Sequence, residues 1–246
     1  MPKLKVRRFK QDHNCCAIAS ISTLANYYNK DMDYLCVKSL VEKANKQDFD
    51  GLYTPEIAIY LNKAGFKSVK VVTANIEQLD FAWKNMSKVK LINEFSRATK
   101  KRIDEETREV MKLYSKFLQS NGNELIIDYK FGDYIRQEID NNRPVFCSYN
   151  WNLMFEWPKM NDDLIDPVKG YVEQHAVVIY GYSDKGVMIC DGHSEMYQGK
   201  LKKYQNGRYL VNWEKLHSVM GYGDLILVDQ YRKPNKDKLI VNAKLV

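Results

Sequence analysis

The chain has 246 residues, of which 45% are hydrophobic and 12% aromatic, so a core of useful size can be buried and wholesale disorder is not expected. The formal net charge of +7 is a moderate excess that requires no anionic partner, and we expect no nucleic-acid partner. No segment approaches the roughly 20 apolar residues of a membrane span, and the N-terminus lacks an apolar signal-peptide region. We expect a cytoplasmic protein, or a secreted one if a leader has been removed.

The first part of the chain is predicted to be mainly helical. An opening strand at residues 4–9 carries alternating basic residues, which we assign to the outer face of an edge strand. Apolar spacing then predicts helices at residues 17–28, 33–44 and 54–64. Thr54 is expected to cap the last of these ahead of Pro55, and Gly65 to end it. A strand follows at residues 68–72.

A long charged stretch occupies the middle of the chain. Residues 76–120 are predicted to be helical throughout, and the mixed charges across residues 97–112 are typical of a solvated helical face. A turn is expected at residues 121–123. A short helix at 134–140 then leads into an apolar strand at 144–149.

The last third of the chain is predicted to be rich in strands. They are expected at residues 176–182, 187–190, 209–211 and 225–228. The turn Ser183–Gly186 joins the first two as a hairpin, and a short helix lies at 213–217. Because helices come first and strands last, an α+β fold is expected rather than an alternating parallel-sheet fold.

The cysteines single out one position. Their odd number and irregular spacing argue against a disulfide framework and against a zinc site. Three of them lie in apolar runs and are expected to be small core residues: Cys36, Cys147 and Cys190. Cys16 begins a predicted helix, whose N-terminus favours the thiolate, although alone it fits a buried small residue equally well. Cys15 lies in the preceding loop and is taken as structural.

A histidine and an aspartate are expected to meet across the predicted hairpin. His175 opens an apolar strand, and a buried imidazole needs a hydrogen-bond partner. Asp191 ends the return strand, so a register centred on the turn makes the two neighbours and lets the carboxylate orient the ring. Gln11 precedes Cys16 by five residues, and with the Cys16 backbone N–H it can hold an oxyanion. Taken alone, His175 is explained equally by a core histidine with a hydrogen-bond partner, and Gln11 by a solvated loop residue.

The other histidines are weaker candidates. His193 is the competing base, ranked lower because it follows the strand in a DGHS turn. His13 is expected to be a surface or rim residue, and His217 an inert residue of a surface helix.

The segment QDHNCCAIASISTLANYY resembles the signature of papain-like bacterial peptidases related to the double-glycine leader peptidases of bacteriocin exporters. Cys16, Ala19, Ser20 and residues 26–28 fall on that pattern, which favours Cys16 over Cys15. The later segments QHAVVIYGY, VMICDG and VNWEKLHSVMGYGDLILVD are also similar to the family, and the likeness covers about two-thirds of the chain.

The resemblance implies a single papain-like domain over residues 1–246. In it, a helical half (1–75) headed by the nucleophile packs against the antiparallel sheet of a β-rich half (123–230) that carries His175 and Asp191. A helical insertion (76–122) and a surface tail (231–246) complete the chain. Two departures stand out: Ala17 replaces the usual glycine after the nucleophile, and the insertion exceeds what a compact member needs.

The function implied is a cysteine peptidase that hydrolyses peptide bonds through Cys16, His175 and Asp191, with Gln11 in the oxyanion hole. It needs no cofactor, and its partner is a peptide or protein substrate. Two alternatives remain open: an acyltransferase or amidase on the same scaffold, and a catalytically silent papain-like binding module. Analysis of the products with and without an added amine distinguishes an acyltransferase from a peptidase. Selective alkylation of Cys16 distinguishes a peptidase from a binding module.

Overall fold

The computed structural model describes residues 1–232 apart from 13–14, 43–50, 102–103, 162–163 and 194–198. Its α-helices are α1 (Cys16–Tyr28), α2 (Tyr34–Glu42), α3 (Thr54–Lys63), α4 (Lys88–Lys101), α5 (Glu105–Gln119), α6 (Phe131–Asp140), α7 (Trp151–Phe155) and α8 (Trp213–Val219). Short 3-10 helices are η1 (Phe81–Trp83), η2 (Gly199–Tyr204) and η3 (Met220–Tyr222). The strands are β1 (Phe66–Thr73), β2 (Glu124–Ile127), β3 (Val145–Asn150), β4 (Met160–Asn161), β5 (Leu164–Ile165), β6 (Gln174–Ser183), β7 (Gly186–Cys190), β8 (Arg208–Val211) and β9 (Asp224–Tyr231).

A mostly antiparallel sheet organises the molecule. Within the described residues it has seven strands in the order β2-β1-β9-β3-β6-β7-β8, and only the β1–β2 pair is parallel. The predicted α+β class is confirmed. The sheet is not confined to the C-terminal half, however, because β1 comes from the first part of the chain and pairs with β9. The four-residue β2, which adds the parallel edge, was not predicted.

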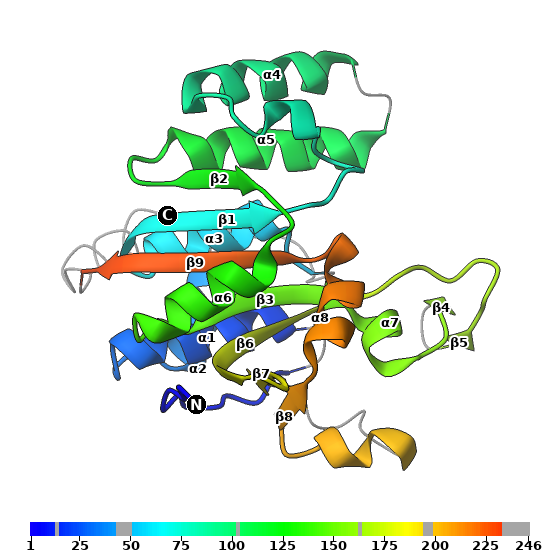
Figure 1. Ribbon diagram of the computed structural model, residues 1–246. Coiled ribbons are helices and arrows are strands. Elements are labelled where there is room, and N and C mark those ends of the chain that lie inside the picture. The colour runs from blue at the N-terminus through cyan, green and yellow to red at the C-terminus, as the bar shows by residue number, and fades with distance from the viewer. Residues whose placement is uncertain (13–14, 43–50, 102–103, 162–163, 194–198, 233–246) are drawn as a thin grey trace.

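Helices cover both faces of this sheet. Helices α1, α2 and α3 lie behind it in Figure 1, whereas α6 and α8 lie in front. Helix α1 packs on β6 through Ile18, Ile21 and Leu24, which recur at helical spacing and are almost fully buried. This packing fixes the start of α1 against the strand that carries His175.

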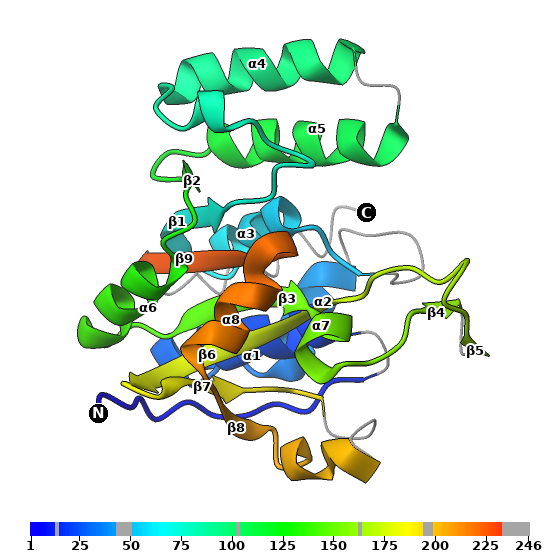
Figure 2. The ribbon, with the colours of Figure 1, turned by 45° about the vertical axis from the view of Figure 1, so that its right-hand side comes forward.

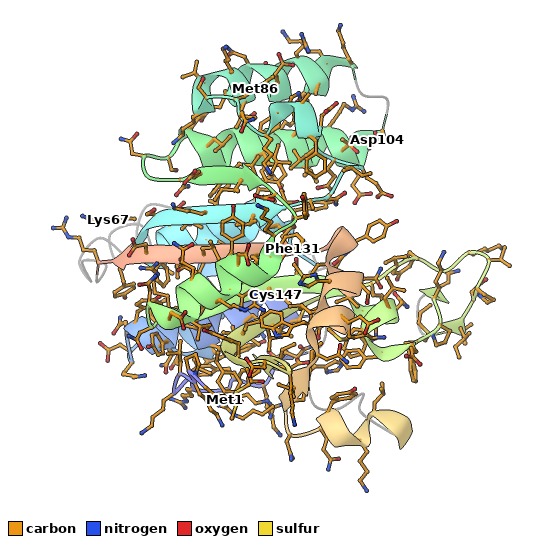
Figure 3. All side chains as sticks on the ribbon, viewed as in Figure 1. Met1, Lys67, Met86, Asp104, Phe131 and Cys147 are labelled. Carbon is orange, nitrogen blue, oxygen red and sulfur yellow. The ribbon has the colours of Figure 1, made fainter. Side chains whose placement is uncertain are left out.

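The middle of the chain forms an outer layer of two helices. Helices α4 and α5 stack beyond β1 and β2 in both views, and α5 packs on α3 (Figures 1 and 2). Figure 3 labels Met86 and Asp104 in this layer, well away from Cys147 in the sheet. The segment is not one continuous helix, because Asp104 caps α5 by accepting the Thr107 N–H at 2.7 Å.

The predicted strand at residues 4–9 is wrong. Backbone pairing of the described N-terminal residues with β6 consists of an isolated bridge between Lys3 and Gly181, a bond from the Leu4 N–H to the Tyr180 carbonyl and one from the Tyr182 N–H to the Pro2 carbonyl. Strand β3 pairs with β6 only as far as Ile179, and the β6–β7 register shifts just beyond it. The N-terminal residues therefore find free backbone groups only along the short remainder of β6, and a longer strand cannot form.

A further expectation needs correction. Thr54 does not cap α3, since Tyr53 holds the N-cap position and the Thr54 hydroxyl instead bonds the Asp224 carboxylate.

Helix α7 and the β4–β5 hairpin, which extend to one side in Figure 1, were not predicted. The expected polar tail lies outside the described residues from position 233 onward. No helix among those described is long and apolar enough to cross a membrane.

Candidate active site

Cys16 is the first residue of α1, and its sulfur faces the start of β6. The helix N-terminus leaves backbone N–H groups unpaired, which favours negative charge beside it. The His175 ring and the backbone N–H of Ala176 lie close enough to the sulfur to lower its pKa. Cys16 is half-buried, so the thiol lies at the edge of the core. These surroundings supply three stabilising contacts for a thiolate.

His175 connects Cys16 to Asp191. It lies near the beginning of β6, opposite Tyr149 of β3, and is 5% exposed. Its Nε2 donates to Asp191 Oδ1 at 2.9 Å, which leaves Nδ1 for the contact with the sulfur. The hairpin expected from the sequence therefore brings the predicted residues together, while their catalytic roles remain predictions.

The charges of this group change two pKa values in opposite directions. Burial alone would raise the pKa of the Cys16 thiol, but the hydrogen bond and positive charge of His175 outweigh it and lower the pKa. Burial alone would lower the pKa of His175, but the Asp191 carboxylate and the thiolate raise it to about 10. Both shifts therefore favour a thiolate–imidazolium pair over the neutral pair.

Asp191 is completely buried and bonded at both carboxylate oxygens. Oδ1 also accepts the backbone N–H of His193 at 2.8 Å, and Oδ2 accepts the Tyr209 hydroxyl at 2.7 Å. The Asp191 N–H donates to the Gly207 carbonyl at 2.8 Å, which continues the pairing of β7 with β8. The carboxylate is therefore fixed in both position and rotation.

The turn after Asp191 is held by the N-terminal segment. Arg8 donates to the carbonyls of Asp191, Gly192 and His193 at 2.6, 3.4 and 3.2 Å. A Cβ on Gly192 would lie 2.7 Å from the Ala19 Cβ, so only glycine lets the turn approach α1 this closely. The sequence placed Arg8 on a solvated strand face, and nothing in its local pattern reveals these contacts.

Gln11 is joined to the same turn. Its backbone N–H donates to the Gly192 carbonyl at 3.1 Å, and its side-chain Oε1 is buried without a hydrogen-bond partner in the described residues. Because the two ends of an amide side chain can exchange by rotation, Gln11 can instead present its NH₂ group at that position. Its role at an oxyanion stays a prediction.

Aromatic rings surround His175. Trp151 of α7 lies 4.9 Å from the His175 ring, and Phe155 lies 4.2 Å from Trp151, measured between ring centroids. Strand β3 ends where β6 begins, so α7 is carried directly to the site. Sequence reasoning missed these rings because α7 was not predicted.

The remaining candidates are sorted by position. The His193 ring lies 5.8 Å from that of His175, and the His193 backbone N–H donates to Asp191 Oδ1 at 2.8 Å. His217 lines a separate pocket of about 230 Å³ together with Phe131 and Met220. His13 lies outside the described residues. No group of three His, Cys, Asp or Glu side chains among those described can hold a metal ion.

Cys15 differs from its neighbour in every respect that matters for reactivity. It is 7% exposed, and its thiol contacts the Tyr34 hydroxyl of α2. Burial raises its pKa, whereas the pKa of Cys16 is lowered. The Cys15 thiol is therefore directed toward α2 and not toward His175.

Comparison with known proteins identifies one related group. The model of a family described as "Peptidase_C39 like family" matches residues 3–220, a span that includes Cys16, His175 and Asp191. Neither the curated proteins nor the solved structures yielded a match.

Proposed function

We propose that this chain, which belongs to the peptidase C39-like family, hydrolyses peptide bonds with Cys16 as nucleophile, His175 as general acid and base, and Asp191 as the group that orients the histidine. Family membership supports a peptidase in general terms. The observation that carries the finer assignment is that the His175 ring lies between the Cys16 sulfur, whose pKa it lowers, and Asp191, to which it is hydrogen-bonded.

The proposed reaction begins from the thiolate–imidazolium pair. The Cys16 sulfur attacks the substrate carbonyl carbon, and the negative charge moves to the carbonyl oxygen. The Cys16 backbone N–H and the Gln11 side chain stabilise that oxygen, a contribution of about 10²–10³ in such sites. His175 gives its proton to the leaving amine as the C–N bond breaks, which leaves a thioester on Cys16.

Water completes the cycle. His175, now neutral, takes a proton from water as the water oxygen attacks the thioester carbonyl. The C–S bond breaks, the carboxylic acid leaves, and the ion pair is restored. Asp191 keeps its charge throughout and holds the ring in one orientation.

Alkylation tests the nucleophile without a known substrate. Iodoacetamide should label Cys16 first at pH 6–7, because its pKa is lowered and those of the other cysteines are raised. Cys36 is the informative control: it is exposed rather than in the core, so that expectation from the sequence is wrong, but its pKa is raised. Faster labelling of Cys36 than of Cys16 would show that exposure, not activation, decides reactivity and would contradict the proposal.

Digestion of a peptide library tests the reaction. His175→Ala should lower the cleavage rate by about 10²–10⁴-fold while the chain stays folded, because the general acid and base is lost. His193→Ala is the matched control and should keep most of the activity. If the two variants are equally active, the base is misassigned; if products form only with an added amine, the enzyme is an acyltransferase.

A further inference from the structure

A hydrogen-bonded pair of tyrosines lies behind the Asp191 carboxylate. The Tyr209 hydroxyl donates to Asp191 Oδ2 at 2.7 Å. The hydroxyl oxygens of Tyr149 and Tyr209 lie 2.9 Å apart. A hydroxyl has one proton, and Tyr209 gives its proton to the carboxylate, so Tyr149 is the donor in the second contact. The bonds therefore run in one direction, from Tyr149 through Tyr209 to Asp191.

Residues of four neighbouring strands, β3, β6, β7 and β8, take part in this arrangement. Tyr149 on β3 pairs directly with His175 on β6, and Tyr209 on β8 pairs with Ile189 of β7, two residues before Asp191. The Tyr209 ring packs against the Tyr204 ring at 4.8 Å. A phenylalanine at position 209 would keep this ring packing and lose only the hydroxyl, so packing alone does not explain why the hydroxyl lies at the carboxylate.

We infer that Tyr209 is a positioning residue for the proposed peptidase site, and that Tyr149 reinforces it. This inference rests on the proposed function. Bonded at Oδ2, the carboxylate cannot rotate about its Cβ–Cγ bond, so Oδ1 stays in line with His175 Nε2. In such directed chains each donor polarises the next, which strengthens the bond to the carboxylate. Tyr209 thus acts through Asp191 on the His175 ring without touching the reacting atoms.

The consequence of losing the hydroxyl has a definite sign. Without the Tyr209 donor, Asp191 is held by the bonds at Oδ1 alone, so the carboxylate can tilt out of line with Nε2 and the imidazolium loses part of its stabilisation. The Cys16 thiolate then loses part of its partner's charge and forms only at higher pH. The other charged or titratable groups near the site do not change in the variant: Glu173, His193, Arg8 and Tyr204.

The test is the pH dependence of Cys16 alkylation by iodoacetamide in the full chain, followed by mass spectrometry. For Tyr209→Phe we expect the acid limb of the rate profile to move up by about half to one pH unit. The Tyr149→Phe profile should move in the same direction by less. Where a cleaved peptide is found, the Tyr209→Phe variant should lose about tenfold in kcat with KM unchanged, because substrate binding is not involved.

A matched control removes a hydroxyl of the same kind elsewhere on the sheet. Tyr182 donates to Asp140 Oδ1 at 2.8 Å, and Tyr182→Phe should leave the alkylation profile unchanged. If Tyr209→Phe folds and its profile coincides with that of the unmodified chain, the inference is overturned. If it does not fold, Tyr149→Phe decides: a shift supports the inference and an unchanged profile overturns it. Because alkylation needs no peptide substrate, a failure here is distinguishable from a failure of the proposed peptidase activity.

Discussion

Asp191 and Asp224 are both buried in the same sheet, but their surroundings differ. Asp191 follows β7 and accepts hydrogen bonds from the N–H groups of His175 and His193 and from a phenolic hydroxyl. Asp224 begins β9, where it lies between Thr73 of β1 and Ser148 of β3 in the ladder. One carboxylate is paired with a group that can carry positive charge; the other lies among neutral groups.

The state of each carboxyl group follows from these partners. Burial raises the pKa of Asp224, and the hydroxyls of Thr54 and Thr73 lower it only in part. Asp224 Oδ1 has no hydrogen-bond partner in the described part of the chain. By contrast, the charge of Asp191 helps to raise the pKa of His175. Burial alone therefore does not distinguish the two carboxylates; what sets Asp191 apart is its contact with His175, a group that can carry positive charge and lies beside Cys16.

The largest expected difference between the two aspartates is in activity. Asp191→Asn removes the charge that stabilises the imidazolium and leaves one acceptor oxygen for three donors. We expect kcat/KM for a cleaved library peptide to fall by roughly 10²-fold, equivalent to about 2–3 kcal/mol. Asp224→Asn, assayed with the same peptide, should stay within about twofold of the unmodified chain. Equal losses in the two variants would mean that both act through the fold.

The pH profile separates the charged pair from an ordinary imidazole. Activity should rise with pH through the lowered pKa of Cys16, as the thiolate forms, and fall through the pKa of His175 near 10, as the leaving group loses its acid. Along each limb, below the pKa of Cys16 and above that of His175, the rate should change by about tenfold per pH unit. The measurement is kcat/KM between pH 5 and 11, with circular dichroism to exclude unfolding. A single transition near the ordinary histidine pKa would contradict the ion pair, and Asp224→Asn should move neither limb.

A smaller effect should follow from loosening the turn that carries Asp191. Arg8→Gln removes the guanidinium that bonds three consecutive carbonyls of that turn. We expect kcat/KM to fall by about tenfold, since roughly one hydrogen bond's worth of positioning energy is lost. Arg7→Gln removes an equal charge from a residue that stacks on the Phe9 ring, and it should have little effect. If both variants lose the same activity, net charge rather than positioning is responsible.

These comparisons also separate what the sequence could predict from what it could not. The meeting of Cys16, His175 and Asp191 in the fold was predictable, because each lies at the boundary of a strongly patterned helix or strand and one hairpin joins the last two. Their catalytic roles are a proposal. Tyr209 and Arg8 contact the same group from other parts of the fold: Arg8 lies 183 positions from Asp191 in the sequence. No local pattern reports such a contact, because it depends on how β8 and the N-terminal segment dock.

Local patterns also failed where tertiary partners took over. Thr54 has the residue type and position of a helix cap, yet its hydroxyl bonds Asp224, which belongs to β9. Residues 4–9 alternate like a strand, yet β6 has backbone groups free for them only beyond Ile179. In both cases the local preference was overridden by groups from distant strands.

The smallest predicted effect concerns stability and runs opposite to the usual expectation for a buried polar group. The pKa of Asp224 is higher in the folded state than in the unfolded state, so the folded chain binds the extra proton. The stability that this group contributes is fully present below the unfolded pKa and is lost as pH rises through the folded pKa. At pH 7, where the unfolded chain carries Asp224 ionised, folding must either bury this charge or protonate it, so the group lowers the stability of the fold. Asp224→Asn removes that charge at almost constant shape, and we expect the free energy of unfolding at pH 7 to rise by about 1 kcal/mol.

Urea denaturation at pH 4 and pH 7 measures this effect, with Asp229→Asn as a control on the same strand. The Asp229 side chain is 53% exposed, so its substitution should change the free energy of unfolding little at either pH. For Asp224→Asn the gain should shrink toward pH 4, where the native carboxyl group is increasingly protonated and already neutral. A loss of stability at pH 7 would mean that the Asp224 carboxyl group stabilises the fold through its hydrogen bonds with the threonine hydroxyls, which contradicts the prediction. The two aspartates would then differ in what they touch but not in their charge.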